Sequence, residues 1–161
     1  MDHIDRIIQA YRTSGVAIDS NLLLLWVIGR MEVSTITRFK RTRGFDADDF
    51  TLLEQILARF ARWHATPSVF TEVSNHLRQL PGGLHRSAFE IFHAIAASVD
   101  ERHFPAEPLL RQHHVSAFGL TDLTLMALAA DGRLVLTVDG LLDDYLLRCE
   151  LGSVNFNHLR S

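Results

Sequence analysis

The sequence predicts an α/β protein, a three-layer α/β/α sandwich around a central, mainly parallel sheet of about four or five strands. Two apolar runs support this prediction, at about residues 15–19 and at 134–138. Short runs rich in Val, Ile and Leu are typical of strands that are buried on both faces of a parallel sheet. Helical segments alternate with these strands, and that alternation implies right-handed parallel crossovers.

The first part of the chain contains the first of these strands. Apolar residues at helical spacing predict a short amphipathic helix over residues 2–12, ahead of the strand, and another helix from about residue 21, after it. Residues 37–44 are basic and predict a loop. The clearest helix is 46–63, because apolar side chains recur along one side and acids occupy the first turn, where the helix dipole favours them.

The second part continues the alternation of strands and helices. Residues 63–65 predict a short strand, and Thr66-Pro67 then begins a helix to about Leu80, with Thr as N-cap and Pro at the first helical position. The remaining predicted elements are a helix at about 87–101, a segment broken by Pro105 and Pro108, a helix at about 120–130, the second apolar strand, a helix at about 140–149 and a strand at 153–158.

Composition narrows the class of protein. The chain has 161 residues and a net charge of −3, which argues against nucleic-acid binding by bulk positive charge. A single cysteine, Cys149, allows neither an internal disulfide nor a cysteine zinc cluster, so a cytoplasmic location is expected. The first residues lack the pattern of a signal peptide. The longest apolar run, 22–28, is far shorter than the roughly 20 residues that span a bilayer.

Four acids stand out by their positions. Asp19 and Asp139 end the two apolar strands, while Glu72 and Asp122 lie in the first two turns of predicted helices. Helices that follow parallel strands begin at the edge where those strands end, so all four acids are expected to converge. Clustered carboxylates repel one another unless they are paired or bind a cation, and oxygen ligands suit Mg²⁺ or Mn²⁺ better than zinc. Taken singly, each acid is also explained by helix-dipole or turn chemistry.

The motifs around these acids resemble the PIN-domain nuclease family over about residues 14–160. In that family an Asp-x-Asn follows the first strand, a Pro-led helix carries a Glu, a later helix carries an Asp, and a Thr-x-Asp ends the next strand. The matching segments here are Asp19-Ser20-Asn21, Thr66-Pro67 through Glu72, Gly119 through Asp122, and Thr137-Val138-Asp139.

The resemblance implies specific roles for these residues. Asp19, Asp122 and Asp139 are expected to hold the principal Mg²⁺ or Mn²⁺, and Glu72 to complete the site or support a second ion. All four acids are thus the expected catalytic and metal-binding residues. Asn21 is expected to orient a carboxylate through its amide. Thr137 is expected to donate its hydroxyl to Asp139 or to a metal-bound water.

The expected activity is that of an endoribonuclease that hydrolyses RNA phosphodiester bonds with a metal-activated water. Many members of the family are toxins of toxin–antitoxin pairs that homodimerise, so an antitoxin and a second copy of the chain are expected partners. The chain is expected to form one domain, 1–161, with an N-terminal helical extension at 1–13 and an extended insertion at 27–63. Two alternatives stay open: a non-catalytic RNA-binding or assembly scaffold, and a structure-specific DNA nuclease.

A basic run provides candidate RNA contacts. Its cations are expected to contact phosphates, and Phe39 among them to stack on a base. The alternative is a solvated loop with no ligand. The candidate RNA-binding residues are Arg38, Lys40, Arg41 and Arg43.

Overall fold

The computed structural model describes residues 3–112 and 116–160, and a five-stranded sheet lies at its centre. The strand order is β3–β2–β1–β4–β5, and every neighbouring pair is parallel, which confirms the predicted α/β class. The strands are β1 (Val16–Ile18), β2 (Trp63–Ala65), β3 (Asp100–Glu101), β4 (Leu134–Thr137) and β5 (Ser153–Asn155).

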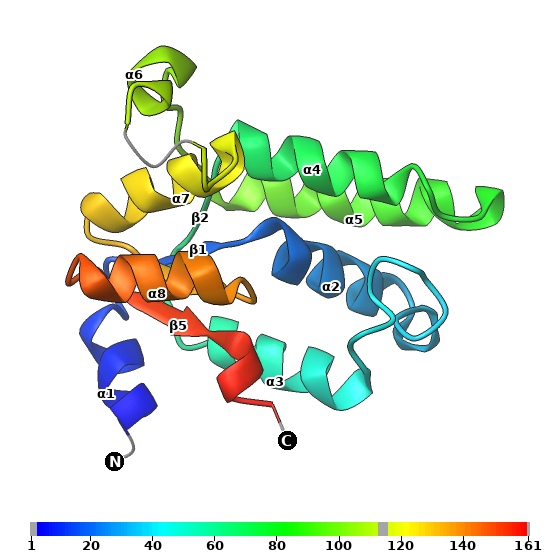
Figure 1. Cartoon of the computed structure of the whole chain (residues 1–161). Helices are drawn as coiled ribbons and strands as arrows, with labels where there is room; N and C mark the ends of the chain where they lie inside the picture. Colours follow the sequence, from blue (N-terminus) through cyan, green and yellow to red (C-terminus); the bar gives the residue numbers. More distant parts are fainter. Residues whose placement is uncertain (1–2, 113–115, 161) are drawn as a thin grey trace.

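The α-helices alternate with the strands along the chain (Figure 1). The seven predicted helices all begin within two residues of the expected position. The helices are α1 (His3–Ala10), α2 (Ser20–Met31), α3 (Ala47–Leu57), α4 (Pro67–Leu77), α5 (His85–Ser98), α6 (Ala106–Leu110), α7 (Leu120–Ala130) and α8 (Gly140–Arg148).

The direction of the crossovers places the helices in two layers. The connections from β1 to β2 and from β2 to β3 move one way across the sheet, whereas those from β3 to β4 and from β4 to β5 move the other way. Because parallel crossovers are right-handed, the two sets of helices cover opposite faces. The first layer contains α2 to α5, with α2 in contact with α3, α4 and α5, and the second contains α7 and α8, which contact β4. This is the predicted three-layer sandwich.

The apolar runs of the sequence form part of the buried core. All residues of β1 and β4 are buried, as expected for central strands of a parallel sheet. The leucine run at the start of α2 is buried as well, because this helix lies between the sheet and the neighbouring helices. Within the ranges that the structure describes, no helix is long and apolar enough to cross a membrane.

Some predicted boundaries were wrong. The helix expected over 46–63 ends at Leu57, and the strand expected over 153–158 ends at Asn155 and continues as a 3₁₀ turn. Residues 100–101, predicted as helix, form edge strand β3, whose two exposed polar residues carry no strand pattern. The short helix α6 includes Pro108, because the first residues of a helix need no intrahelical N–H partner.

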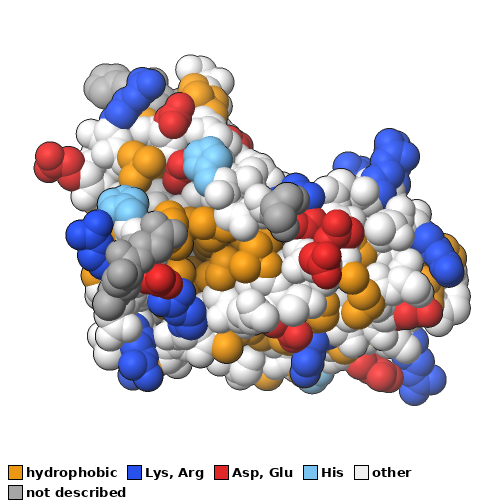
Figure 2. Space-filling model, turned by 90° about the horizontal axis from the view of Figure 1, so that it is seen from below, with side chains coloured by type: hydrophobic (Ala, Val, Ile, Leu, Met, Phe, Trp, Pro, Cys, Tyr) orange, Lys and Arg blue, Asp and Glu red, His pale blue; other side chains and the backbone are white. Residues whose placement is uncertain are grey.

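Figure 2 views the molecule from the side that carries α1, α3 and the C-terminal end in Figure 1. Hydrophobic side chains gather around a hollow on this face (Figure 2). A cavity of about 180 Å³ also lies between α1, α8 and β5, and its lining includes Ile4, Ile7 and Val154. The N-terminal helix therefore packs on the β5 side of the domain through its apolar stripe.

Candidate functional site

The predicted strand-end acids lie where the strand order reverses. β1 and β4 are neighbours, but the chain leaves β1 toward β2 and leaves β4 toward β5. The connecting helices depart on opposite faces at this point, which is where α/β proteins commonly bind ligands. Asp19 follows β1 and Asp139 follows β4, and the backbone N–H of Asp19 donates to the carbonyl of Leu136 at 3.1 Å. The fold thus brings both acids to one edge.

Asp19 is a buried carboxylate, with only 5% of its surface exposed. Its Oδ1 accepts from the backbone N–H of Leu22 at 2.8 Å, which caps α2. Its Oδ2 accepts from the hydroxyl of Thr137 at 2.6 Å and from the N–H of Val138 at 2.8 Å. Burial raises the pKa of Asp19, and these three donors act against that shift because they stabilise the charged form.

Thr137 links the two strand-end acids. Its side chain is fully buried, and its hydroxyl donates to Asp19 while it accepts from the backbone N–H of Asp139 at 2.9 Å. The expectation that Thr137 donates to Asp139 was wrong, because its hydroxyl donates its hydrogen bond to the buried Asp19 carboxylate instead. Asp139 instead uses Oδ1 to cap α8, where it accepts from the N–H groups of Leu141 and Leu142 at 2.8 and 3.2 Å.

Glu72 is held by two hydroxyl groups that the sequence reasoning missed. Ser20 donates to Oε2 at 2.5 Å, and Thr121 donates to Oε1 at 2.6 Å. These bonds join α4 to the first turns of α2 and α7. The only sequence signal for them is adjacency, since Ser20 follows Asp19 and Thr121 precedes Asp122.

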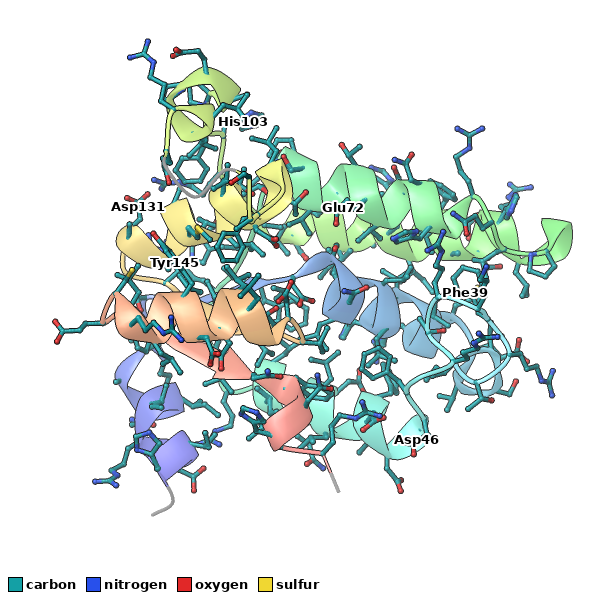
Figure 3. The ribbon with its side chains drawn as sticks, viewed as in Figure 1. Phe39, Asp46, Glu72, His103, Asp131 and Tyr145 are labelled. Atoms are coloured by element: carbon teal, nitrogen blue, oxygen red, sulfur yellow. The ribbon has the colours of Figure 1, made fainter. Side chains whose placement is uncertain are left out.

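Asp122 interacts electrostatically with the other three acids. Burial, and then the negative charges of Asp139, Glu72 and Asp19, raise its pKa to about 6. Charges act on one another in this way when they are close and poorly screened by solvent. All four predicted acids therefore belong to one cluster, which we call the acidic site. Figure 3 shows Glu72 on α4 beside the start of α7.

The acidic site is not arranged as a ready-made metal cage. Among residues 3–112 and 116–160, no three His, Cys, Asp or Glu side chains converge on a point that would hold a metal ion. The reason is local, since Asp19, Asp139 and Glu72 each turn their oxygens to backbone N–H or hydroxyl donors. Asn21, expected to orient a carboxylate, is exposed on the first turn of α2.

The basic loop extends from the end of α2 to α3 (Figure 1). Arg38, Lys40 and Arg43 are exposed, and no ion pair involves them within the part of the chain that the structure describes. Arg41 donates from Nε to Oε1 of Gln79 at 2.9 Å, which ties the loop to the end of α4. Phe39 is only 7% exposed and packs into the core, so the expectation that it stacks openly on a base was wrong.

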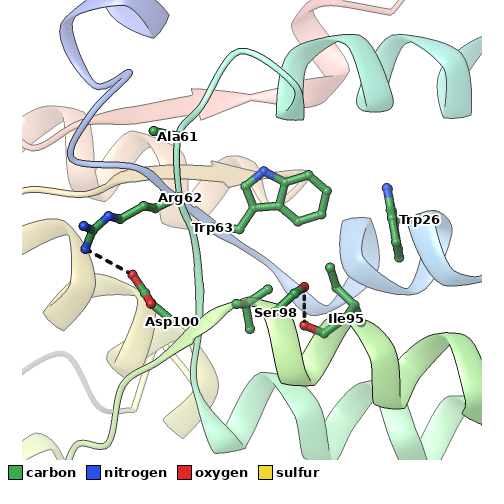
Figure 4. A pocket seen from close by; sticks show the side chains of 8 residues that line it. Trp26, Ala61, Arg62, Trp63, Ile95, Ser98 and Asp100 are labelled. Atoms are coloured by element: carbon green, nitrogen blue, oxygen red, sulfur yellow. Dashed lines mark hydrogen bonds and ion pairs between the residues drawn. The ribbon is translucent and has the colours of Figure 1, made fainter.

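A cavity of about 420 Å³ lies at the other edge of the sheet (Figure 4). Trp26 and Trp63 meet edge to face there, with ring centroids 5.6 Å apart, beside the Arg62–Asp100 ion pair. Trp63 begins β2 and Asp100 begins β3, so this cavity lies at the amino ends of the strands. It is separate from the acidic site, which lies at their carboxyl ends.

No family model matches the chain, and no curated protein matches it. The function of the site is therefore inferred from its geometry and chemistry.

Proposed function

We propose that this protein is a divalent-metal-dependent endoribonuclease of PIN-like type. The observation that supports this proposal most strongly is the acidic site itself, in which burial, and then the charges of the neighbouring carboxylates, raise the pKa of Asp122 to about 6. A protein gains no stability from such crowding, so the arrangement is understandable when a cation neutralises it. The site also lies at the strand-order reversal, where this fold class binds its ligands.

The donor set fits Mg²⁺ or Mn²⁺. The candidate ligands are carboxylate oxygens, with neither cysteine nor histidine among them, and hard divalent ions prefer such oxygens. Asp19, Asp122 and Asp139 would hold the principal ion, and Glu72 would complete the site or support a second one. An ion in this position would activate a water and neutralise charge on the phosphate.

Hydrogen bonds from neighbouring residues orient these acids. Thr137 and the N–H of Val138 fix one oxygen of Asp19, and Ser20 and Thr121 hold Glu72. Four helices, α2, α4, α7 and α8, begin at this edge of the sheet, and the positive ends of their dipoles stabilise the carboxylates and an incoming phosphate.

RNA is the proposed substrate because Arg38, Lys40, Arg41 and Arg43 are exposed and form no ion pair among the described residues, on a chain whose net charge is −3. Other exposed arginines, such as Arg12 and Arg78, also lack an ion pair within the described ranges, so what distinguishes this loop is the clustering of its four cations. Such a local patch suits a polyanion that must be brought to the metal.

The decisive experiment compares wild type with Asp19→Asn on a fluorescent single-stranded RNA, with Mn²⁺, with Mg²⁺ and with EDTA. We expect divalent-dependent cleavage that falls by roughly 100-fold or more in Asp19→Asn. Asparagine is also a good N-cap and keeps one oxygen for the N–H of Leu22. Its amide nitrogen replaces the oxygen that accepts from Thr137 and Val138, so the folding of the variant is checked by circular dichroism alongside its activity. Asp144→Asn, an exposed acid on α8, is the matched control and should cleave normally.

Two outcomes would contradict the proposal. Equal cleavage by wild type and Asp19→Asn would show that the acidic site does no chemistry. Binding of RNA without cleavage under any divalent ion would favour a non-catalytic scaffold. A parallel series with single-stranded and flap DNA tests the structure-specific DNA nuclease.

A further inference from the structure

We propose that a pocket between the basic loop and the α4–α5 turn binds one nucleotide of the substrate strand, a few positions from the phosphate that the acidic site holds. This inference rests on the proposed function. We call this cavity the loop pocket. The inference is about a second contact with the RNA strand, outside the acidic site. The acidic site does not depend on this contact.

The loop pocket has a volume of about 450 Å³. This volume lies within the usual range for small-molecule pockets, roughly 300–1,000 Å³. Phe39, Pro81 and Leu84 supply apolar walls, and Arg38 and Lys40 supply positive charge at the same cavity. Apolar walls suit the face of a base, and adjacent cations suit its phosphate.

The charge of the loop pocket favours an anion. Its one acid, Glu32, already accepts hydrogen bonds from the hydroxyls of Ser34 and Thr35, both at 3.0 Å. Glu32 makes no ion pair with Arg38 or Lys40 among the described residues. The two cations therefore exceed the one acid, and they are available to a phosphate.

Gln79 supplies a polar group for the edge of the base. Its Oε1 accepts from Arg41, so the group that it offers to a ligand is the Nε2 amide donor. An amide donor beside an apolar wall is a common means of recognising a base carbonyl. The basic residues were predicted from the sequence to bind RNA, whereas this pocket and Gln79 were not.

The loop pocket is connected to the acidic site along α4. Glu72 and His76 lie one turn apart on this helix, which ends at Leu77, and Gln79 is the second residue after that end. The five residue steps of helix from Glu72 to Leu77 span roughly 7.5 Å, about two stacked nucleotides at 3.4 Å each, and the turn to Gln79 adds to this distance. The pKa of His76 is lowered by burial and then by Arg41, while Glu72 raises it, so His76 senses the charges of both the loop and the acid. Figure 3 labels Glu72 on α4 and Phe39 in the loop that follows α2.

Binding can be located without cleavage by recording amide NMR spectra of the whole protein in EDTA. The probes are an oligouridylate of about eight nucleotides, uridine monophosphate, and a glutamate peptide of similar length. We expect the oligouridylate to shift amides in 35–41 and 79–84, and the mononucleotide to shift the same amides at higher concentration. No response at these residues to either nucleotide, or an equal response to the peptide, would overturn the nucleotide pocket.

Two variants separate the phosphate contact from the base contact. Arg38→Ala with Lys40→Ala should weaken oligouridylate binding and reduce the slope of log K against log salt by about 1.4, that is about 0.7 per lost phosphate contact. Leu84→Ala should weaken binding several-fold without changing that slope, because it removes only apolar contact. The matched control is Arg111→Ala with Arg148→Ala, which removes two exposed cations at the opposite end of the molecule (Figure 1).

The outcomes distinguish this inference from the proposed nuclease. An unchanged salt slope in Arg38→Ala with Lys40→Ala, while RNA is still cleaved, would overturn the loop pocket and leave the nuclease in place. The predicted shifts and slopes without cleavage under any divalent ion would support the loop pocket and refute the nuclease.

Discussion

At the scale of single residues, the acidic site depends on hydroxyl groups that adjoin its acids in the sequence. Thr137 stands two residues before Asp139, Ser20 follows Asp19, and Thr121 precedes Asp122. The positions of the acids were predictable, because strand ends and helix starts share one edge of a parallel sheet. Thr137 was expected as a hydroxyl donor, although to a different acceptor, whereas Ser20 and Thr121 were not predictable, since their bonds to Glu72 join distant parts of the chain and appear only after folding.

Replacement of Thr137 by valine tests the link between the two strand-end acids. Valine keeps the shape but removes the donor to Asp19 and the acceptor for the N–H of Asp139. Leaving a buried charged group short of a donor costs about 1–3 kcal/mol, so we expect a loss of that size in the free energy of unfolding by urea in EDTA. Thr137→Ser should recover most of it.

Thr124→Val is the control for this prediction. Thr124 is also buried, but its hydroxyl bonds only to neutral groups, the hydroxyl of Thr66 at 2.9 Å and the carbonyl of Thr121 at 2.7 Å. Its loss should cost less, about 1 kcal/mol. Equal losses in Thr137→Val and Thr124→Val would mean that the charge of Asp19 adds nothing to the bond.

The raised pKa of Asp122 predicts an unusual dependence of stability on pH. Between its ordinary value of 3.8 and about 6, the folded protein binds more protons than the unfolded chain. The free energy of unfolding without metal should therefore fall as pH rises through this window. Asp122→Asn removes the repulsion and should be more stable than wild type at pH 7. Asp144→Asn, with an exposed carboxyl, should keep the wild-type profile; a wild-type profile in Asp122→Asn would contradict the carboxylate crowding.

At the scale of elements, apolar patterns predicted the strands whose residues are buried and did not predict the strand whose residues are exposed. β1 and β4 were predictable because every one of their residues is buried and apolar or small. β3 was missed because both of its residues are exposed acids, and only pairing with β2 makes them a strand. Phe39 was misassigned for the opposite reason, since basic neighbours concealed a side chain that packs into the core.

The contact between α2 and α3 depends on a glycine. A Cβ at Gly29 would overlap the ring of Phe50, which is itself buried. Although alanine favours a helix by about 1 kcal/mol, overpacking of this kind costs about 1–3 kcal/mol. We expect Gly29→Ala to lower the urea midpoint and to separate α3 from α2.

Two variants test this explanation of Gly29. Gly44→Ala lies where a Cβ would meet nothing within 4 Å and should leave the midpoint nearly unchanged. Phe50→Leu combined with Gly29→Ala should show positive coupling, because the smaller side chain makes room for the new methyl group. Strict additivity of the two changes would mean that the stability lost in Gly29→Ala does not come from contact with Phe50.

At the scale of the whole molecule, the fold gathers negative charge at one edge of the sheet and relieves it only in part. The order β3–β2–β1–β4–β5 brings acids from four separate helix starts and strand ends to one edge of the sheet. Helix dipoles and hydroxyl donors offset some of the repulsion, yet the raised pKa of Asp122 shows that a cost remains. A cation that removes this cost should bind the folded protein and not the unfolded chain.

Mn²⁺ should therefore raise the melting temperature of the protein. A ligand at about 100 times its Kd stabilises the folded state by about 2.7 kcal/mol, which corresponds to a rise of roughly 5–10 °C for a domain of this size. We expect this rise in wild type at pH 7, measured against EDTA and against Ca²⁺ at equal ionic strength. Asp19→Asn and Asp139→Asn should each lose most of it, and Asp144→Asn should retain it. An equal rise in Asp139→Asn and Asp144→Asn would place the ion outside the acidic site.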